Sequence, residues 1–187
     1  MTGSYRAPEL PSDPNSSGTA YTFLATMVQI LGEDEAIAYM KKLNENVNQY
    51  TKSGAAPAQA ASRGETLIGI SFQHDLVTPA VTSAVPMVVV APCEGTGFEV
   101  GSMSIIKGAP NLDNAKKWYD WALTPEAQAL AAQANSFQVP SNKNAPTPEA
   151  APKLAEIKLI DYDFAKYGSS DERKRLLGRW DKEIAAQ

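Results

Sequence analysis

The chain is 187 residues long, which suits one domain or two small ones and excludes a large multidomain protein. Hydrophobic residues make up 43% of it and charged residues 20%, fractions typical of a chain that folds around a packed core. Lys and Arg number 17 against 21 Asp and Glu, so the net charge is −4 and the basic character of nucleic-acid-binding proteins is missing. We therefore expect a folded protein without a nucleic-acid partner.

The sequence holds few of the residues that build redox or metal sites. A single cysteine, Cys93, excludes an intrachain disulfide and a cysteine-based zinc cage, and a single histidine, His74, excludes a multi-histidine metal site. No motif indicates a cofactor, and none is expected. No apolar run has the length of a signal-peptide core or of a membrane span, which takes ~18 residues, so the chain as written fits a cytoplasmic protein or one whose export signal has been removed.

The first half of the chain predicts a helical hairpin after a proline-rich, extended lead-in over residues 1–16. Apolar residues recur at helical spacing over residues 18–31, and Gly32 ends this segment. A second amphipathic helix follows over residues 33–43, with three acidic residues in its first turn, where they favour the positive end of the helix dipole. A short helix is expected near residues 58–62.

Three apolar, β-branched runs predict strands at residues 66–72, 85–92 and 98–106. The first two are separated by residues 74–84, which is long enough for a crossover helix. A strand, a crossover and a second strand favour a parallel or mixed sheet with helices on its faces. The expected fold class is therefore α/β.

The remainder of the chain predicts helices again. One covers residues 112–122, where Trp118 and Trp121 have the spacing of core packing, and another begins at Thr124 and Pro125. A proline-rich surface loop follows over residues 136–152. Ser169, with a glutamate three positions later, predicts a capping box for a last helix that buries four apolar residues, namely Leu176, Leu177, Trp180 and Ile184.

The dipeptide His74-Asp75 is the strongest candidate site. It directly follows the first predicted strand, and ligands of open α/β sheets bind at the ends of strands. Since no serine or cysteine nucleophile can be paired with it from the sequence, a catalytic triad is not supported. The alternative is that His74 lies on the surface and Asp75 caps the crossover helix.

Two further segments have the composition of ligand-binding loops. Asn15 to Thr22, with the sequence NSSGTAYT, begins a helix whose free backbone N–H groups suit a phosphate or a carboxylate, helped by the Ser17 and Thr19 hydroxyls. It lacks the lysine of a P-loop, and an ordinary helix N-cap is its alternative. The second segment, CEGTGFEVG, begins at Cys93 and offers glycines for close approach and a carboxylate at Glu94 or Glu99, although a plain connection between strands would look the same.

Three long motifs together resemble one family. They are PNSSGTAYT at residues 14–22, YMKKLNENVNQYTKSGAAPAQAASRGETLIGISFQHD at residues 39–75, and EGTGFEVGSMSIIKGAPNLDNAKKWYDWALTPEAQ at residues 94–128. In this order they resemble the solute-binding proteins of ABC importers, in the branch that includes periplasmic ferric-binding proteins. The resemblance implies a periplasmic-binding-protein-like (type 2) α/β fold, whose two lobes close around a ligand about crossover strands.

Within this branch, ferric-binding members carry consecutive tyrosines where this chain has His74 and Asp75. A ferric ion prefers phenolate or carboxylate oxygens, so this replacement argues against iron. Members that bind hexose phosphates resemble the chain better, with a His-Asp pair here and a downstream glutamate that matches Glu99. The resemblance implies that these three side chains bind sugar hydroxyls and that residues at a helix start help to hold the phosphate, namely Ser17, Gly18 and Thr19.

The resemblance also implies an architecture and partners. Residues 1–100 correspond to the second ligand-binding lobe, and residues 101–187 to a crossover strand and a helical return to a first lobe that is incomplete here. An incomplete lobe leaves a sheet edge exposed, through which two copies of the chain can pair. The implied function is non-enzymatic binding of a phosphorylated sugar in the periplasm, for transfer to the membrane permease of an importer.

Three other hypotheses remain open at this point. The same fold could bind a ferric ion or an organophosphonate instead of a sugar phosphate. An enzyme could use His74 and Asp75 as an acid/base pair, although no nucleophile or cofactor motif supports it. The chain could also be an interaction domain without a ligand.

Overall fold

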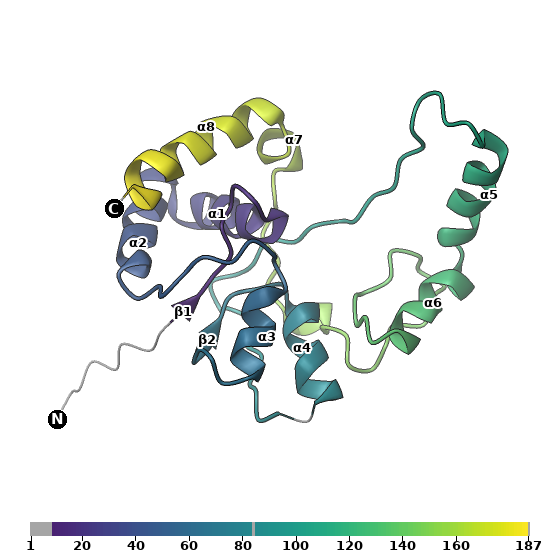
Figure 1. Ribbon diagram of the computed structural model, residues 1–187, viewed down its shortest axis with the longest axis horizontal. Coiled ribbons are helices and arrows are strands. Elements are labelled where there is room, and N and C mark those ends of the chain that lie inside the picture. The colour runs from purple at the N-terminus through teal and green to yellow at the C-terminus, as the bar shows by residue number, and fades with distance from the viewer. Residues whose placement is uncertain (1–8, 84, 187) are drawn as a thin grey trace.

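The predicted helical hairpin forms the centre of the molecule. The computed structural model describes residues 9–83 and 85–186, and in it α1 spans Gly18–Leu31 and α2 spans Glu33–Asn44. Gly32 alone separates them, with a φ of 85° that favours glycine over any residue with a side chain. The hairpin predicted over residues 18–43 is therefore confirmed (Figure 1).

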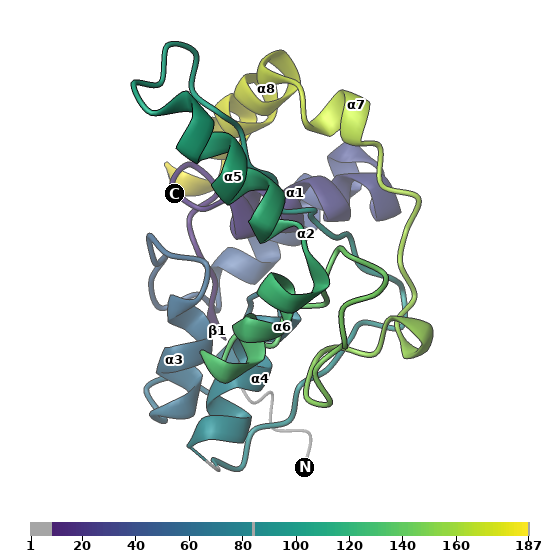
Figure 2. The same cartoon turned by 90° about the vertical axis from the view of Figure 1, so that its right-hand side faces the viewer.

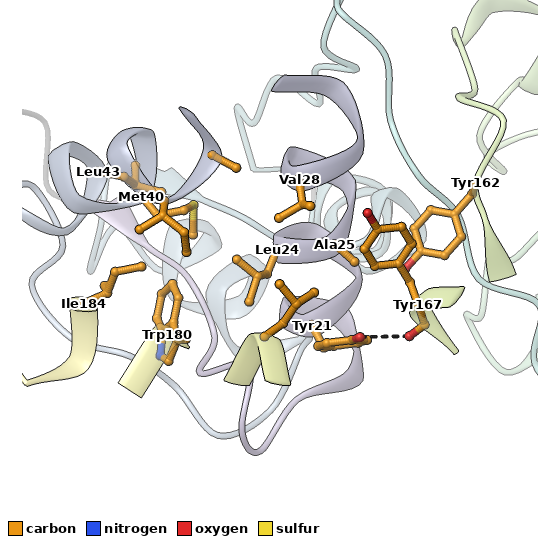
Figure 3. Close-up of a cluster of buried hydrophobic side chains, with 13 residues drawn as sticks. Tyr21, Leu24, Ala25, Val28, Met40, Leu43, Tyr162, Tyr167, Trp180 and Ile184 are labelled. Carbon is orange, nitrogen blue, oxygen red and sulfur yellow. Dashed lines mark hydrogen bonds between the residues drawn. The ribbon is translucent and has the colours of Figure 1, made fainter. Parts of the chain in front are cut away.

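The two ends of the described chain share one hydrophobic core. Helix α8 (Ser170–Trp180) and the π-helical turn η2 (Asp181–Ala185) pack on the α1–α2 hairpin, as Figure 3 shows. Leu24, Leu176 and Ile184 are at most 1% exposed. The predicted burial of the last helix is confirmed for Leu176, Trp180 and Ile184, whereas Leu177 is only partly buried. The core contains thirteen buried residues, namely Tyr21, Leu24, Ala25, Val28, Ala36, Ile37, Met40, Leu43, Tyr162, Tyr167, Leu176, Trp180 and Ile184.

This core contains residues from both sides of the predicted domain boundary near residue 100. Tyr21 of α1 donates a hydrogen bond of 2.8 Å to the backbone carbonyl of Tyr167, in the short helix α7 (Phe164–Tyr167). Ser169 then caps α8 by accepting a hydrogen bond from the backbone N–H of Glu172, so the predicted cap is confirmed. The side chain of Glu172 turns to Arg175 instead of completing the capping box.

A second group of elements packs beside the hairpin. Strand β1 (Glu9–Leu10) pairs in parallel with β2 (Ile68–Gly69), and this is the only sheet among the described residues. Helix α3 (Ala56–Ser62) contacts both β2 and α4 (Gln73–Thr82). Ala84, the last residue of the expected crossover helix, lies outside the described residues, as do residues 1–8 of the predicted lead-in.

The strand predictions for residues 85–92 and 98–106 are wrong. Neither segment forms a strand, and of residues 66–72 only Ile68 and Gly69 do. β-Branched residues favour an extended backbone, whereas a strand also requires a neighbour that accepts and donates its backbone hydrogen bonds. Within the described chain these two segments have no such neighbour.

Helices α5 (Leu112–Ala122) and α6 (Pro125–Gln133) stand apart from the other helices (Figures 1 and 2). The predicted cap at Thr124 is confirmed, since its side chain accepts a hydrogen bond from the Ala127 N–H. The prediction that Trp118 and Trp121 are core residues is wrong, because their side chains are 63% and 44% exposed. The chain returns through the 3₁₀ turn η1 (Leu154–Glu156) to α7.

Candidate functional site

The start of α1 presents unused hydrogen-bond donors. The carbonyl of Asp13 accepts hydrogen bonds from the N–H groups of Ser16 and Ser17, which turns the chain into the helix. Ser17 is the N-cap and accepts a 3.3 Å hydrogen bond from the Ala20 N–H. In the described structure the backbone N–H groups of Gly18 and Thr19, and the Thr19 hydroxyl, make no hydrogen bond. This arrangement suits an anion.

Gly54 and Glu99 lie next to this helix start although they are distant in sequence. A β-carbon added to Gly54 would overlap the Thr19 hydroxyl, so the loop before α3 contacts the helix here. The Glu99 carboxylate comes within 3.9 Å of the position that a β-carbon on Gly18 would occupy. The structure therefore brings four predicted site residues together, namely Ser17, Gly18, Thr19 and Glu99.

The start of α4 carries the other two predicted residues. Asp75 lies in its first turn, and the Asp75 Oδ2 atom is 3.4 Å from the Ser71 hydroxyl, which also donates a 2.6 Å hydrogen bond to the Gly54 carbonyl. Ser71 thus links Asp75 to the loop that contacts Thr19. Both the His74 and Asp75 side chains are about one quarter exposed.

His74 faces the neighbouring Gln138 rather than the start of α1. Its Nε2 atom is 3.2 Å from the Gln138 side-chain nitrogen and 3.6 Å from the Asp75 Oδ1 atom, and its ring stacks on Phe72. The structure gives no direct contact between His74 and the residues at the start of α1. The six predicted residues therefore form two groups, which Gly54 and Ser71 connect.

Thr19 of the first group lines one cavity, and His74 and Asp75 of the second group line another. The smaller cavity, of about 80 Å³, is lined by Thr19, Ser71, Phe72 and Thr96 among others, and has the size of a small anion or a few water molecules. The larger, of about 410 Å³, lies between α3, α4 and residues 135–138, and both His74 and Asp75 line it. A volume of several hundred Å³ is typical of small-molecule sites.

The Glu99 carboxylate lies near the phenol of Tyr162. Tyr162 lies nearby in the core, and burial first, then neighbouring groups including Glu99, raise the pKa of its phenol to about 12. The phenol therefore stays neutral at physiological pH. No lysine or arginine forms an ion pair with Glu99 within the described chain.

Only some residues of the segment from Cys93 to Gly101 contribute to the candidate site. Glu94 is exposed, and its own backbone N–H followed by the Cys93 thiol lowers the pKa of its carboxyl group. Neither Cys93 nor Glu94 lines a described cavity, whereas Thr96 and Gly97 line the smaller one. Of the two glutamates left open by the sequence, Glu99 is the one at the helix start.

Sequence reasoning missed three residues that connect or line the site. They are Gly54, Ser71 and Gln138. Ser71 lies three residues before His74, near the end of the first predicted strand, and could have been included, because a hydroxyl near a strand end is a usual ligand donor. Gly54 and Gln138 reach the site only through long-range packing, for which a single sequence gives no signal.

Two classes of feature are not found in the described part of the chain. No three His, Cys, Asp or Glu side chains gather there in an arrangement that could hold a metal ion. Over residues 9–83 and 85–186, no helix has both the length and the apolar character to cross a membrane.

Comparison with solved structures places this fold among periplasmic binding proteins. The periplasmic binding protein AfuA from Actinobacillus pleuropneumoniae, solved with exogenous fructose-6-phosphate bound, superposes with a TM-score of 0.92 at 49% identity. The match covers all of this chain and 59% of AfuA. The periplasmic binding protein P5PA matches 94% of this chain and 56% of its own with a TM-score of 0.83 at 41% identity. These neighbours confirm the expected fold class.

Comparison of sequences gives the same assignment. An uncharacterised protein of Haemophilus influenzae is 49% identical over 174 residues, which are 92% of this chain and 50% of that protein. The chain thus spans between half and three fifths of the length of these relatives. The matched family and neighbours are binding proteins and not enzymes, as the resemblance implied. The family model for bacterial extracellular solute-binding proteins matches residues 10–167, and the chain belongs to this family.

Proposed function

We propose that this chain carries the ligand-binding surface of a periplasmic receptor for a phosphorylated sugar, such as a hexose phosphate, which an ABC importer's membrane permease would take up. The observation that carries the proposal is the start of α1, where the N–H groups of Gly18 and Thr19 are unused and the Glu99 carboxylate lies close to Gly18. A phosphate needs donors and a sugar hydroxyl needs an acceptor, and this place offers both. The bound sugar phosphate of the similar AfuA supports this ligand class.

The phosphate group is assigned to the Thr19 side of the helix start. There it would receive hydrogen bonds from the backbone N–H groups of Gly18 and Thr19 and from the Thr19 hydroxyl, while Ser17 keeps its capping bond and can still donate its proton. Two anions at one helix end repel each other. A sugar hydroxyl, and not the phosphate, is therefore assigned to the Glu99 carboxylate.

The remaining sugar hydroxyls are assigned to the start of α4. The Asp75 carboxylate accepts hydrogen bonds from them. Ser71 keeps the Asp75 carboxylate beside the loop that contacts Thr19. His74 can donate or accept from its ring nitrogens, and its present contact with Gln138 can be exchanged for a ligand hydroxyl. Both residues also line the cavity of about 410 Å³.

Calorimetric titration tests this assignment. Fructose 6-phosphate, glucose 6-phosphate, fructose and inorganic phosphate are titrated into the chain, with an aminoalkylphosphonate and ferric citrate as competing ligand classes. Thr19→Val keeps the shape of the side chain but removes a donor to a charged group, which should weaken sugar-phosphate binding roughly tenfold or more. Thr147→Val, at an exposed threonine outside both cavities, serves as the matched control.

Two further variants separate the roles of the carboxylate and the imidazole. Glu99→Gln should weaken binding of the hexose phosphate while leaving inorganic phosphate equally or more tightly bound, because a negative charge beside the phosphate is removed. His74→Ala should weaken the sugar phosphate and leave inorganic phosphate unchanged. Equal binding of all ligands by all variants, or preference for ferric citrate with a visible charge-transfer band, would overturn the proposal.

A further inference from the structure

The loop that follows α6 is fixed in a defined conformation. Asn135 has a φ of 58°, a left-handed backbone conformation that asparagine adopts more readily than most residues. The N–H of Ser136 donates a 2.9 Å hydrogen bond back to the Ala131 carbonyl, which turns the chain at the end of the helix. Phe137 is then only 9% exposed. Gln138 follows directly after this buried side chain.

Two contacts hold this loop against α4. The Thr78 hydroxyl lies 3.3 Å from the Asn135 carbonyl and 2.9 Å from the His74 carbonyl, so it joins the loop to the helical turn that begins at His74. The Gln138 side-chain nitrogen lies 3.2 Å from His74 Nε2. Gln138 is exposed and lines the cavity of about 410 Å³ together with His74. Its amide therefore contacts the imidazole at the cavity.

The atoms in the Gln138 contact define the protonation of the imidazole. The amide nitrogen of a glutamine donates hydrogen bonds and cannot accept them, so His74 Nε2 is the acceptor. The ring is then neutral, and its proton lies on Nδ1. The Phe72 ring stacks on the imidazole, with centroids 5.7 Å apart, and supports this orientation.

The same arrangement keeps His74 and Asp75 from pairing with each other. The distance from His74 Nε2 to Asp75 Oδ1 is 3.6 Å, which is too long for a hydrogen bond, and an Nε2 atom without a proton has nothing to donate to a carboxylate. The Ser71 hydroxyl lies 3.4 Å from the other carboxylate oxygen, Oδ2. Within the described residues Oδ1 forms no hydrogen bond, so it is available as an acceptor.

Without Gln138, His74 and Asp75 would satisfy each other. The imidazole proton would move from Nδ1 to Nε2, which has the Asp75 carboxylate beside it, and a small rotation would shorten the distance of 3.6 Å to that of a hydrogen bond. Nε2 could then no longer accept a hydrogen bond from a ligand hydroxyl, and Oδ1 would already be in use.

We propose that Gln138 is a positioning residue, which donates to His74 Nε2 in the free chain and so keeps His74 and Asp75 as two separate acceptors for ligand hydroxyls. An entering hydroxyl replaces the amide at Nε2. The inference rests on the proposed function for the ligand, whereas the tautomer of His74 is a property of the free chain.

Nuclear magnetic resonance of the imidazole nitrogens tests the free chain. His74 is the only histidine, so a long-range proton–nitrogen spectrum of the untagged protein shows one ring, and its two nitrogen shifts distinguish the tautomers. At about pH 8, where an ordinary imidazole is neutral, the parent chain should carry its proton on Nδ1. Gln138→Leu removes the donor and Gln138→Glu replaces it with acceptors, so both should move the proton to Nε2. Gln133→Leu, at an exposed glutamine that ends α6 and lines neither cavity, is the matched control and should keep the parent spectrum.

Calorimetric titration with fructose 6-phosphate tests the consequence for binding. Gln138→Leu should weaken binding roughly three- to tenfold, the effect of about one hydrogen bond, and Gln138→Glu should weaken it at least as much. Inorganic phosphate, which has no sugar hydroxyl, should bind equally to Gln138→Leu and to the parent chain. Gln133→Leu should bind both ligands as the parent does. Because Gln138 and Gln133 are exposed, circular dichroism should show the same fold for every variant.

Either of two results contradicts the proposal. One is a parent chain with its imidazole proton on Nε2. The other is a Gln138→Leu variant that keeps the proton on Nδ1, or that binds fructose 6-phosphate as tightly as the parent chain. Failure of every variant and of the parent to bind any sugar phosphate would instead overturn the proposed function, and the spectra would still show whether Gln138 sets the tautomer of His74.

Discussion

Replacing Glu33 by glutamine should destabilise the protein at neutral pH by loosening α8 from the helical hairpin. The Glu33 carboxylate, at the first position of α2, accepts hydrogen bonds of 2.6 and 2.8 Å from Arg175 and one of 2.8 Å from Arg179. These contacts join residues more than 140 positions apart. They also place a negative charge at the positive end of the α2 dipole.

The pKa of Glu33 sets the size of this effect. Its hydrogen bonds to Arg175, followed by those to Arg179, lower the pKa from 4.5 to about 2, against an opposing effect of burial. A shift of this size corresponds to about 3 kcal/mol of stability at neutral pH, and screening at a surface site reduces it to ~1–2 kcal/mol. A lowered pKa stabilises the fold above pH 4.5, and the contribution is lost as the pH falls through 4.5 towards 2.

Urea denaturation followed by circular dichroism, at pH 7 and pH 3, measures this contribution. Glu33→Gln should lower the free energy of unfolding by ~1–2 kcal/mol at pH 7, or Tm by ~2–8 °C, and by clearly less at pH 3. Asp34→Asn is the matched control, because Asp34 is 91% exposed and bonds only Arg179. A loss that is the same at both pH values, or no loss at pH 7, would refute this reasoning.

Four other substitutions test the core and the site. Leu24→Ala removes a fully buried side chain and should lower the free energy of unfolding by ~2–5 kcal/mol in urea denaturation. Tyr21→Phe leaves a buried carbonyl without its donor and should cost ~1–3 kcal/mol in the same assay, with ligand affinity by calorimetry unchanged. Gly54→Ala pushes a methyl group against the Thr19 hydroxyl and should weaken sugar-phosphate binding roughly tenfold, whereas Gly178→Ala, with open space around it, should stabilise the chain by ~0.4–1 kcal/mol and leave binding unchanged. A Gly54→Ala variant that binds as tightly as the parent chain would contradict the contact assigned here.

The site shows which of its features a local sequence pattern can predict. Residues 17–19 and residues 74 and 75 both lie at helix starts, as their sequence predicts, because an N-cap depends on neighbours within one helical turn. The connection between the two helix starts was not predictable. It depends on Gly54, whose missing side chain lets a loop approach Thr19, and on Ser71, which bridges that loop to Asp75.

Helices were determined largely by the sequence itself. The bounds of α1 and α2 and the caps at Thr124 and Ser169 follow from hydrogen bonds and apolar spacings within about four residues along the chain. Strands and burial were decided by tertiary structure. Residues 98–106 have the composition of a strand but no strand partner among the described residues, and Trp118 has the spacing of a core residue but is 63% exposed. Strand pairing and side-chain burial depend on which other segments are present. A local pattern specifies only that a segment can form a strand or can pack in a core.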